Sequence, residues 1–271
     1  MSWQYVPLTL AVVVQCAAMS WAAYRRAQAR RAMRSLKGML DAYRAGDYET
    51  ALRFIDSMQG NRLIRGSATL RGGMLLNLGR IDEAEQCLRE GIALKLDSKR
   101  MALAYSSLGQ LLLERKRYNE AMQCFQTSLK HWPERGSTHR DIAEACLRRG
   151  ANTAEAVKWA RLAVTEDRAT KAASPQAKES ADINLGEDLA TLAWAVAADS
   201  RDRDEVDRLV DEALPLVRNV VPVTARVRCY AGHAYQALGD SRNSEYHFDE
   251  AARIDPHGLW GRSARAAATL V

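Results

Sequence analysis

Hydrophobic residues between Ala102 and Arg135 recur at helical spacing in two successive halves of that stretch. Tyr105, Leu108 and Leu112 repeat in the first half, and Phe125 belongs to the matching series in the second half. A short polar turn of three basic residues separates the two series. Apolar positions that recur with the helical period mark amphipathic helices, so this stretch predicts two helices joined by a tight turn.

Small residues accompany the bulky ones in this stretch and allow the two helices to approach closely, chiefly Gly109 and Ala121. The same alternation of bulky and small positions recurs along the chain, with copies at residues 42–58, 70–96, 142–163, 192–213 and 230–256. The alanine that opens each second helix falls at positions 51, 84, 121 and 156, in steps of 33, 37 and 35 residues. Such regular spacing predicts a helical repeat array, in which each unit buries its apolar face against its neighbours.

The repeated pattern of bulky residue, Leu-Gly, alanine, aromatic residue and closing proline resembles the tetratricopeptide repeat (TPR). The resemblance covers roughly residues 32–256. It implies an all-α fold, a right-handed α-solenoid of about six TPR-like helical hairpins. Strand signals are sparse in the sequence, which agrees with that fold class.

Composition divides this array into two parts. Residues 168–181 are small and polar and include one proline, so we expect a linker or a mobile helical extension there. The linker separates TPR-like repeats at 32–167 from further repeats at 182–256. Residues 257–271 are expected to form a short terminal helix that covers the open end of the array.

The N-terminal segment from Val6 to Tyr24 contains 19 residues and no charge. As a helix it would extend over about 28 Å, close to the hydrocarbon core of a bilayer. We therefore expect residues 1–24 to form a signal anchor, a single transmembrane helix. A cleaved signal peptide is the main alternative, but no basic residue precedes the apolar run. A buried core helix is the other alternative.

A basic run follows the uncharged segment and is expected to form a juxtamembrane helix at residues 25–31 and beyond. Its six basic residues are Arg25, Arg26, Arg30, Arg31, Arg34 and Lys37. The positive-inside rule then predicts a single-pass membrane protein whose repeats face the cytoplasm, with these side chains near the membrane surface. The run equals the whole net charge of +6, so the remainder of the chain sums to zero and offers no nucleic-acid-binding face.

No residue pattern in the chain points to catalysis or to a cofactor. The five cysteines are dispersed and form no CxxC pair, and the five histidines include no HExxH motif. Phosphate-binding glycine motifs are also missing from the sequence. We therefore expect no catalytic residue, no metal site and no cofactor, and an enzyme with an unrecognised site is the less favoured alternative.

The resemblance to TPR proteins implies a scaffold that binds a protein or peptide in a concave groove lined by the first helix of each unit. Projection onto that face selects Ser106, Gln110, Arg140, Glu144, Trp194, Arg226 and His233. One subset of the family grips a carboxylate with Lys and Asn at such positions, which here carry other residues. Arg140 would then favour an acidic partner segment.

The sequence therefore predicts a membrane-anchored TPR scaffold in the assembly or regulation of a membrane-associated complex. A secreted or periplasmic TPR protein with a cleaved signal peptide remains the alternative. Ala18 and Ala22 lie four residues apart in the uncharged segment and would allow two copies to pack as a homo-oligomer.

Overall fold

The computed structural model describes residues 6–57, 67–94, 97–150, 152–173 and 178–269, with the side chains of residues 6–18 and 67 outside the description. This part of the chain contains thirteen α-helices and no strand, which confirms the all-α, TPR-like solenoid. The helices are α1 (Val6–Arg44), α2 (Tyr48–Ser57), α3 (Ser67–Asn77), α4 (Ile81–Ala93), α5 (Ser98–Glu114), α6 (Tyr118–His131), α7 (Gly136–Arg149), α8 (Thr153–Ala173), α9 (Lys178–Asp199), α10 (Arg203–Leu216), α11 (Val221–Leu238), α12 (Ser241–Ile254) and α13 (Leu259–Ala268). Successive pairs pack as hairpins, from α1 with α2 to α11 with α12.

A left-handed residue ends the first helix of several hairpins. At Gly46 and Gly239 the φ angles are 75° and 79°, a conformation that glycine adopts without steric cost. The following amide of Asp240 donates to the carbonyl of Tyr235, which satisfies a helix-terminal acceptor. The carboxylate of Asp240 then accepts from the backbone amide of Asn243 and caps the next helix. The short turns that the repeat pattern predicts are thereby fixed by local hydrogen bonds.

A glycine in the first helix of three hairpins faces a phenylalanine sixteen residues later in the second helix. A Cβ atom at Gly109 would lie 2.4 Å from the ring of Phe125, and one at Gly232 would lie 2.6 Å from the ring of Phe248. In the first hairpin, Gly38 meets Phe54 in the same way. The rings of Phe125 and Phe248 are fully buried. The close approach of two helices, at a glycine that faces a phenylalanine, is therefore a feature that repeats along the array.

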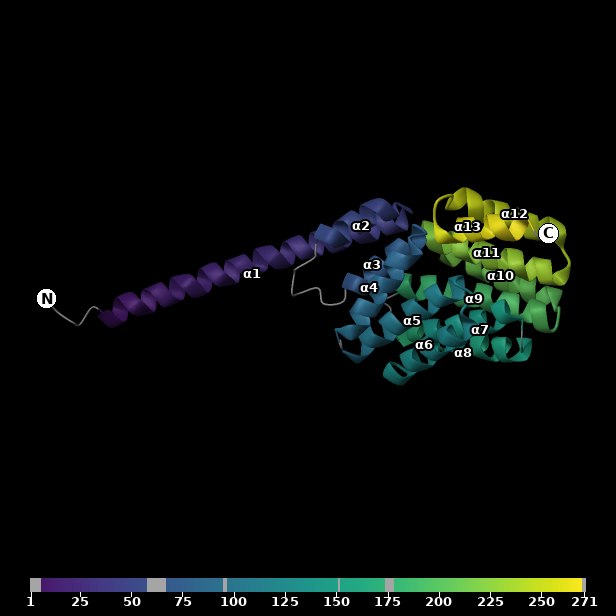
Figure 1. Cartoon of the computed structure of the whole chain (residues 1–271), viewed down its shortest axis with the longest axis horizontal. Coiled ribbons are helices and arrows are strands. Elements are labelled where there is room, and N and C mark those ends of the chain that lie inside the picture. Colours follow the sequence, from purple (N-terminus) through teal and green to yellow (C-terminus); the bar gives the residue numbers. More distant parts are fainter. Residues whose placement is uncertain (1–5, 58–66, 95–96, 151, 174–177, 270–271) are drawn as a thin grey trace.

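The array curves until its first and last hairpins meet. Tyr48, at the start of α2, donates a hydrogen bond of 2.7 Å to Asp255, which follows α12. In addition, α1 contacts α11 and α13 contacts α3. Figure 1 shows α12 and α13 next to the ends of α2 and α3. The concave side consequently curves around an interior space that stays partly open to solvent.

Helices extend into both ends of the segment that we expected to be a linker. Residues 168–173 continue α8 and residues 178–181 begin α9. The two helices pack against each other, and α7 also contacts α9. The four residues 174–177 lie outside the described residues. The repeats before and after this segment thus belong to one packed array.

The expected membrane localisation is wrong. No helix within the described residues is long and apolar enough to cross a membrane. Much of the expected anchor, residues 1–5 and the side chains of residues 6–18, lies outside the described residues. The structure therefore gives no support to a single-pass protein whose repeats face the cytoplasm.

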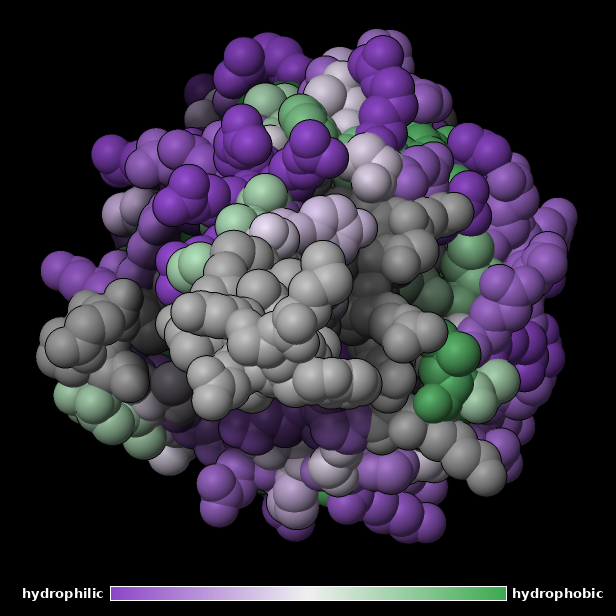
Figure 2. All heavy atoms as spheres, turned by 90° about the vertical axis from the view of Figure 1, so that its left-hand side faces the viewer, coloured by the Kyte–Doolittle hydropathy of each residue, from purple (hydrophilic) through white to green (hydrophobic). Residues whose placement is uncertain are grey.

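The N-terminal half of α1 projects from the packed array as a continuous helix (Figure 1). The six basic side chains of residues 25–37 are exposed along it, together with Trp21 and Tyr24. The guanidinium of Arg25 lies 4.8 Å from the centre of the Trp21 ring. Seen along this helix, hydrophilic side chains dominate the visible surface, with small hydrophobic patches between them (Figure 2).

Candidate partner-binding cavity

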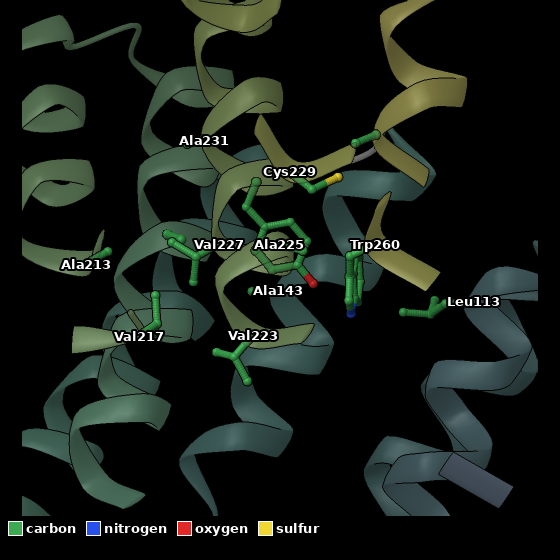
Figure 3. Packing of buried hydrophobic residues seen from close by; sticks show 14 of the residues in the cluster. Leu113, Ala143, Ala213, Val217, Val223, Ala225, Val227, Cys229, Ala231 and Trp260 are labelled. Atoms are coloured by element: carbon green, nitrogen blue, oxygen red, sulfur yellow. The ribbon is translucent and has the colours of Figure 1, made fainter. Parts of the chain in front are cut away.

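A cavity of about 620 Å³ occupies the interior space enclosed by the array. Its walls come chiefly from helices that lie far apart in the sequence, α1, α3, α5, α7, α9, α11 and α13, with Leu88 of α4 added. Most lining side chains are apolar, among them Met39, Met74, Leu113 and Val223. In Figure 3, Trp260 of α13 lies between Leu113 and the labelled side chains of α11. The volume falls within the range of about 300–1,000 Å³ that is typical of ligand pockets.

Three leucines from three different helices line the cavity and remain partly exposed. Leu40 of α1 is 45% exposed, Leu70 of α3 is 36% exposed and Leu103 of α5 is 39% exposed. Because large apolar side chains gain free energy when they leave water, such a group favours contact with another apolar surface. The three leucines are called the leucine rim below.

Four charged side chains lie together at one end of this largely apolar cavity, and Arg100, near the start of α5, lines it separately. Arg226 of α11 is buried and contacts Glu144 of α7 and Glu187 of α9, with nitrogen-to-oxygen distances of 3.2 Å in both cases. Its guanidinium also lies 4.7 Å from the centre of the Trp260 ring. Glu144, Glu187 and Arg226 all line the cavity. Glu114 of α5 lines it as well, so acidic groups outnumber basic ones at this end.

These groups belong to a larger buried ion network. Arg140 contacts Glu187 at 3.0 Å and Asp188 at 2.9 Å. Arg148 contacts Glu114 and Glu144, both at 2.7 Å. The network, linked by ion pairs of at most 3.8 Å, comprises Arg140, Arg148, Arg226, Glu114, Asp141, Glu144, Glu187 and Asp188. Removing one member would leave another charge buried without its partner, which is costly in free energy.

Two residues of α5 join this network through neutral hydrogen bonds. The hydroxyl of Ser106 donates to one oxygen of Asp141 at 2.6 Å, and the amide of Gln110 donates to the other oxygen at 2.9 Å. Asp141 is 1% exposed. Its carboxylate therefore ties α5 to α7 below the cavity, and both of its oxygens have a partner.

The pKa values of the neighbouring groups reflect burial and the excess of acid. Burial raises the pKa of Asp188 well above its usual range, and the nearby carboxyl groups of Asp167 and Glu187 act in the same direction. Burial also raises the pKa of Tyr43 in α1 to about 12, with the charge of Glu187 as the next cause. Both shifts disfavour additional negative charge in this region.

The structure gathers most of the seven sequence-predicted groove residues but gives them different roles. Gln110, Glu144 and Arg226 line the cavity. Ser106 and Arg140 are buried in or beside the ion network, at 3% and 4% exposure. Trp194 and His233 stack on each other with ring centres 4.6 Å apart and do not line the cavity.

Sequence reasoning did not identify the acidic members of the network. Asp141, Glu187 and Asp188 are the clearest cases. Glu187 and Asp188 lie in α9, which buries residues on nearly all sides of this part of the helix, including Leu185 and Leu189. An acidic pair inside a stretch that is apolar all round the helix was a signal that the carboxyl groups would be buried and paired.

In the part of the chain that the structure describes, no group of three or more histidine, cysteine, aspartate or glutamate residues is arranged to hold a metal ion. The carboxylates of the ion network contact arginines instead. The arrangement can bind and desolvate a partner's side chains, since it combines apolar walls with a small number of fixed charges.

Comparisons with known proteins support this description of the fold. The sequence model of the family described as tetratricopeptide repeat matches residues 74–129 and 107–177. Among solved structures, a Rap protein complexed with competence and sporulation factor aligns with a TM-score of 0.57 and 16% identity, over 89% of this chain and 70% of that chain. A thermophilic TPR protein of Thermus thermophilus aligns with a TM-score of 0.51 and 18% identity, over 77% of this chain and 100% of that chain. No curated protein matches the sequence significantly.

At 16% and 18% sequence identity the structural likeness shows the fold alone. The family match adds that the repeats within residues 74–177 are similar to the tetratricopeptide repeat. Both agree with the hairpin pattern and the repeated glycine–phenylalanine contacts. Residues 74–177 match the tetratricopeptide-repeat model, and the described chain has the fold of a TPR-like helical array.

Proposed function

We propose that this protein is a non-enzymatic scaffold that binds a protein or peptide partner in the cavity enclosed by its repeats. The observation that carries the proposal is the leucine rim, three partly exposed leucines from α1, α3 and α5 beside an apolar cavity. An array that had only to support itself would gain free energy by burying these side chains.

The shape of the rim favours a polypeptide over a compact small molecule. Its three leucines come from separate helices, and axes of packed helices lie about 8–10 Å apart. A partner that covers all three therefore has to extend over more than one helix width. Gln110, Glu144 and Arg226 supply the polar groups that orient it.

Relatives in fold are consistent with this function. TPR proteins are generally scaffolds, and the Rap protein of the aligned structure is complexed with competence and sporulation factor. The partner of the present chain is a proposal from its own cavity, because the identity to that Rap protein is only 16%.

The test is selection of a random peptide display library on the full chain, with two matched variants. Leu103 of the rim and Leu162 of α8 are both 39% exposed, but Leu162 does not line the cavity. We expect related apolar peptides to be enriched on the wild-type chain and on Leu162→Glu, and to be lost on Leu103→Glu. Circular dichroism of each variant checks the fold. The proposal is overturned if no family of related peptides is enriched on the wild-type chain. It is also overturned if the same peptides are enriched equally on Leu103→Glu.

A further inference from the structure

The cavity contains an unbalanced set of charges. The ion network holds three arginines against five acidic residues, so its formal charge is −2 with Asp188 ionised and −1 with Asp188 protonated, the form that burial favours. Three of the acids, Glu114, Glu144 and Glu187, line the cavity itself. We infer that the polypeptide segment bound here carries a lysine or arginine among apolar residues, and that its cationic group binds at these three glutamates. The inference rests on the proposed function and specifies the chemistry of the partner.

Arg226, the arginine beside these glutamates, already has internal partners, and the other lining arginine, Arg100, forms an ion pair with Asp97 at 3.3 Å. Arg226 directs Nε to the hydroxyl of Tyr230 at 2.9 Å, Nη1 to Glu187 at 3.2 Å and Nη2 to Glu144 at 3.2 Å. An anionic group would have to displace a carboxylate from this guanidinium and would then face the remaining acids. Arg226 therefore holds Glu144 and Glu187 in place through these hydrogen bonds, and it does not bind an anion from the partner.

The carboxylates retain capacity for a further donor. A carboxylate has two oxygens with about four acceptor sites, and each glutamate here uses only part of them. Glu114 accepts from Arg148 at 2.7 Å, and its side chain is still 15% exposed. An ammonium or guanidinium group that enters from the cavity can therefore contact Glu114 without breaking an existing ion pair.

The apolar surroundings strengthen this preference. Leu113 and Trp260 line the same cavity as the glutamates, so water is partly excluded and charges interact more strongly than in bulk solvent. A cation lowers the charge imbalance of the network, whereas an anion increases it. The leucine rim accepts the apolar neighbours of that cation in the partner.

The structure also removes the basis for an acidic partner segment, which the sequence had assigned to Arg140. That side chain is 4% exposed and does not line the cavity. Its Nη1 atom contacts both Glu187 and Asp188. Arg140 thus balances buried acids and is not available to a partner.

The experiment measures binding of a synthetic peptide set to the full chain by fluorescence anisotropy. The peptides are apolar sequences of about nine residues that differ only at the central position, which holds Lys, Arg, Gln or Glu. We expect Lys and Arg peptides to bind about tenfold tighter than the Glu peptide, with Gln between them. In Glu114→Gln the preference for the Lys peptide over the Gln peptide should fall severalfold. The variant should keep its fold, since Arg148 retains its second partner, Glu144.

The matched control is Glu212→Gln, because Glu212 forms an ion pair with Arg168 and does not line the cavity. This control should leave the charge preference unchanged. If peptides bind but the Glu peptide binds as tightly as the Lys peptide, or if Glu114→Gln keeps the full preference, this inference fails while the proposed function stands. If no peptide of the set binds and the display selection also yields none, the proposed function fails and the inference fails with it.

Discussion

The hydroxyl of Tyr48 donates a hydrogen bond of 2.7 Å to the carboxylate of Asp255, and the two residues are 207 positions apart in the chain. Both side chains are 2% exposed. The amide of Gly258 donates to the other oxygen of Asp255 at 3.0 Å, so this carboxylate joins the first hairpin to the turn before α13. Because the contact closes the array, it also encloses the cavity between the two ends.

Removal of the Tyr48 hydroxyl should weaken this closure. Tyr48→Phe leaves one oxygen of a buried carboxyl group without its donor, which we expect to lower the free energy of unfolding by about 1–3 kcal/mol. Denaturant titration of the full chain measures the change. Tyr246→Phe is the control, since Tyr246 is 53% exposed and should change stability by less than about 0.5 kcal/mol. Equal stability of the two variants would contradict the role of the Tyr48 contact.

The close approach within each hairpin predicts a different response at two glycines. In Gly109→Ala the new Cβ would lie 2.4 Å from the buried ring of Phe125. We expect a loss of about 1–3 kcal/mol from the displaced ring. At Gly73 no atom lies within 4 Å of an added Cβ, so Gly73→Ala should stabilise α3 by up to about 1 kcal/mol through helix propensity. Thermal unfolding that moves in the same direction for both variants would refute this packing.

Reversal of a buried charge should disrupt the ion network. Arg140→Glu would place a third carboxylate beside Glu187 and Asp188, and we expect a loss of at least about 3–5 kcal/mol or failure to fold. The sequence analysis places Arg140 on the groove face, whereas in the structure this residue is 4% exposed. In contrast, Arg161→Glu affects an ion pair whose arginine is 53% exposed, and it should cost at most about 1 kcal/mol. Chemical denaturation of the two variants compares them, and similar stabilities would argue against the buried network.

The stack of Trp194 and His233 predicts a loss of stability in mild acid. Burial lowers the pKa of His233 to about 4, whereas histidine in an unfolded chain has a pKa of about 6.5. The unfolded state therefore binds protons in this interval and the folded state does not. The contribution of neutral His233 is complete above about pH 6.5 and is lost as the pH falls toward 4.

Comparison with His233→Phe isolates this effect from other titrating groups, because Phe keeps an aromatic ring against Trp194. We expect the wild type to lose up to about 2 kcal/mol more than the variant between about pH 7 and pH 5. Buried acids with raised pKa values, such as Asp188, act in the opposite direction and remain in both proteins. Parallel stability curves for the two proteins would show that His233 titrates normally.

The hairpins could be predicted from the sequence because their packing is local. Gly109 meets Phe125 only sixteen residues later, within one repeat, so the spacing of small and bulky residues already contains the contact. The shared face of Arg140 and Glu144 could be predicted for the same reason, since residues four apart on a helix are neighbours. These local regularities account for the fold class and for three of the residues that line the cavity, Gln110, Glu144 and Arg226.

The closure of the array could not be predicted in this way. Whether Arg226 reaches Glu144 depends on the small rotation between successive repeats, which accumulates over 82 positions and has no local sequence signal. Closure turns a predicted open groove into a partly open cavity and buries polar residues that were expected to line that groove, such as Ser106 and Arg140. The membrane prediction rested on an uncharged segment with a basic flank, whereas no helix within the described residues is long and apolar enough to cross a membrane.

Hydrogen–deuterium exchange of the full chain, with and without a peptide from the display selection, tests most directly whether the cavity holds the partner. The predicted result is slower exchange in residues 36–43 of α1, 69–77 of α3 and 100–114 of α5, which line the cavity. Exchange in the outer helix α8 around Leu162 should stay the same, because that residue does not line the cavity. Protection confined to α8 or α10, with none in α1, α3 and α5, would contradict the account.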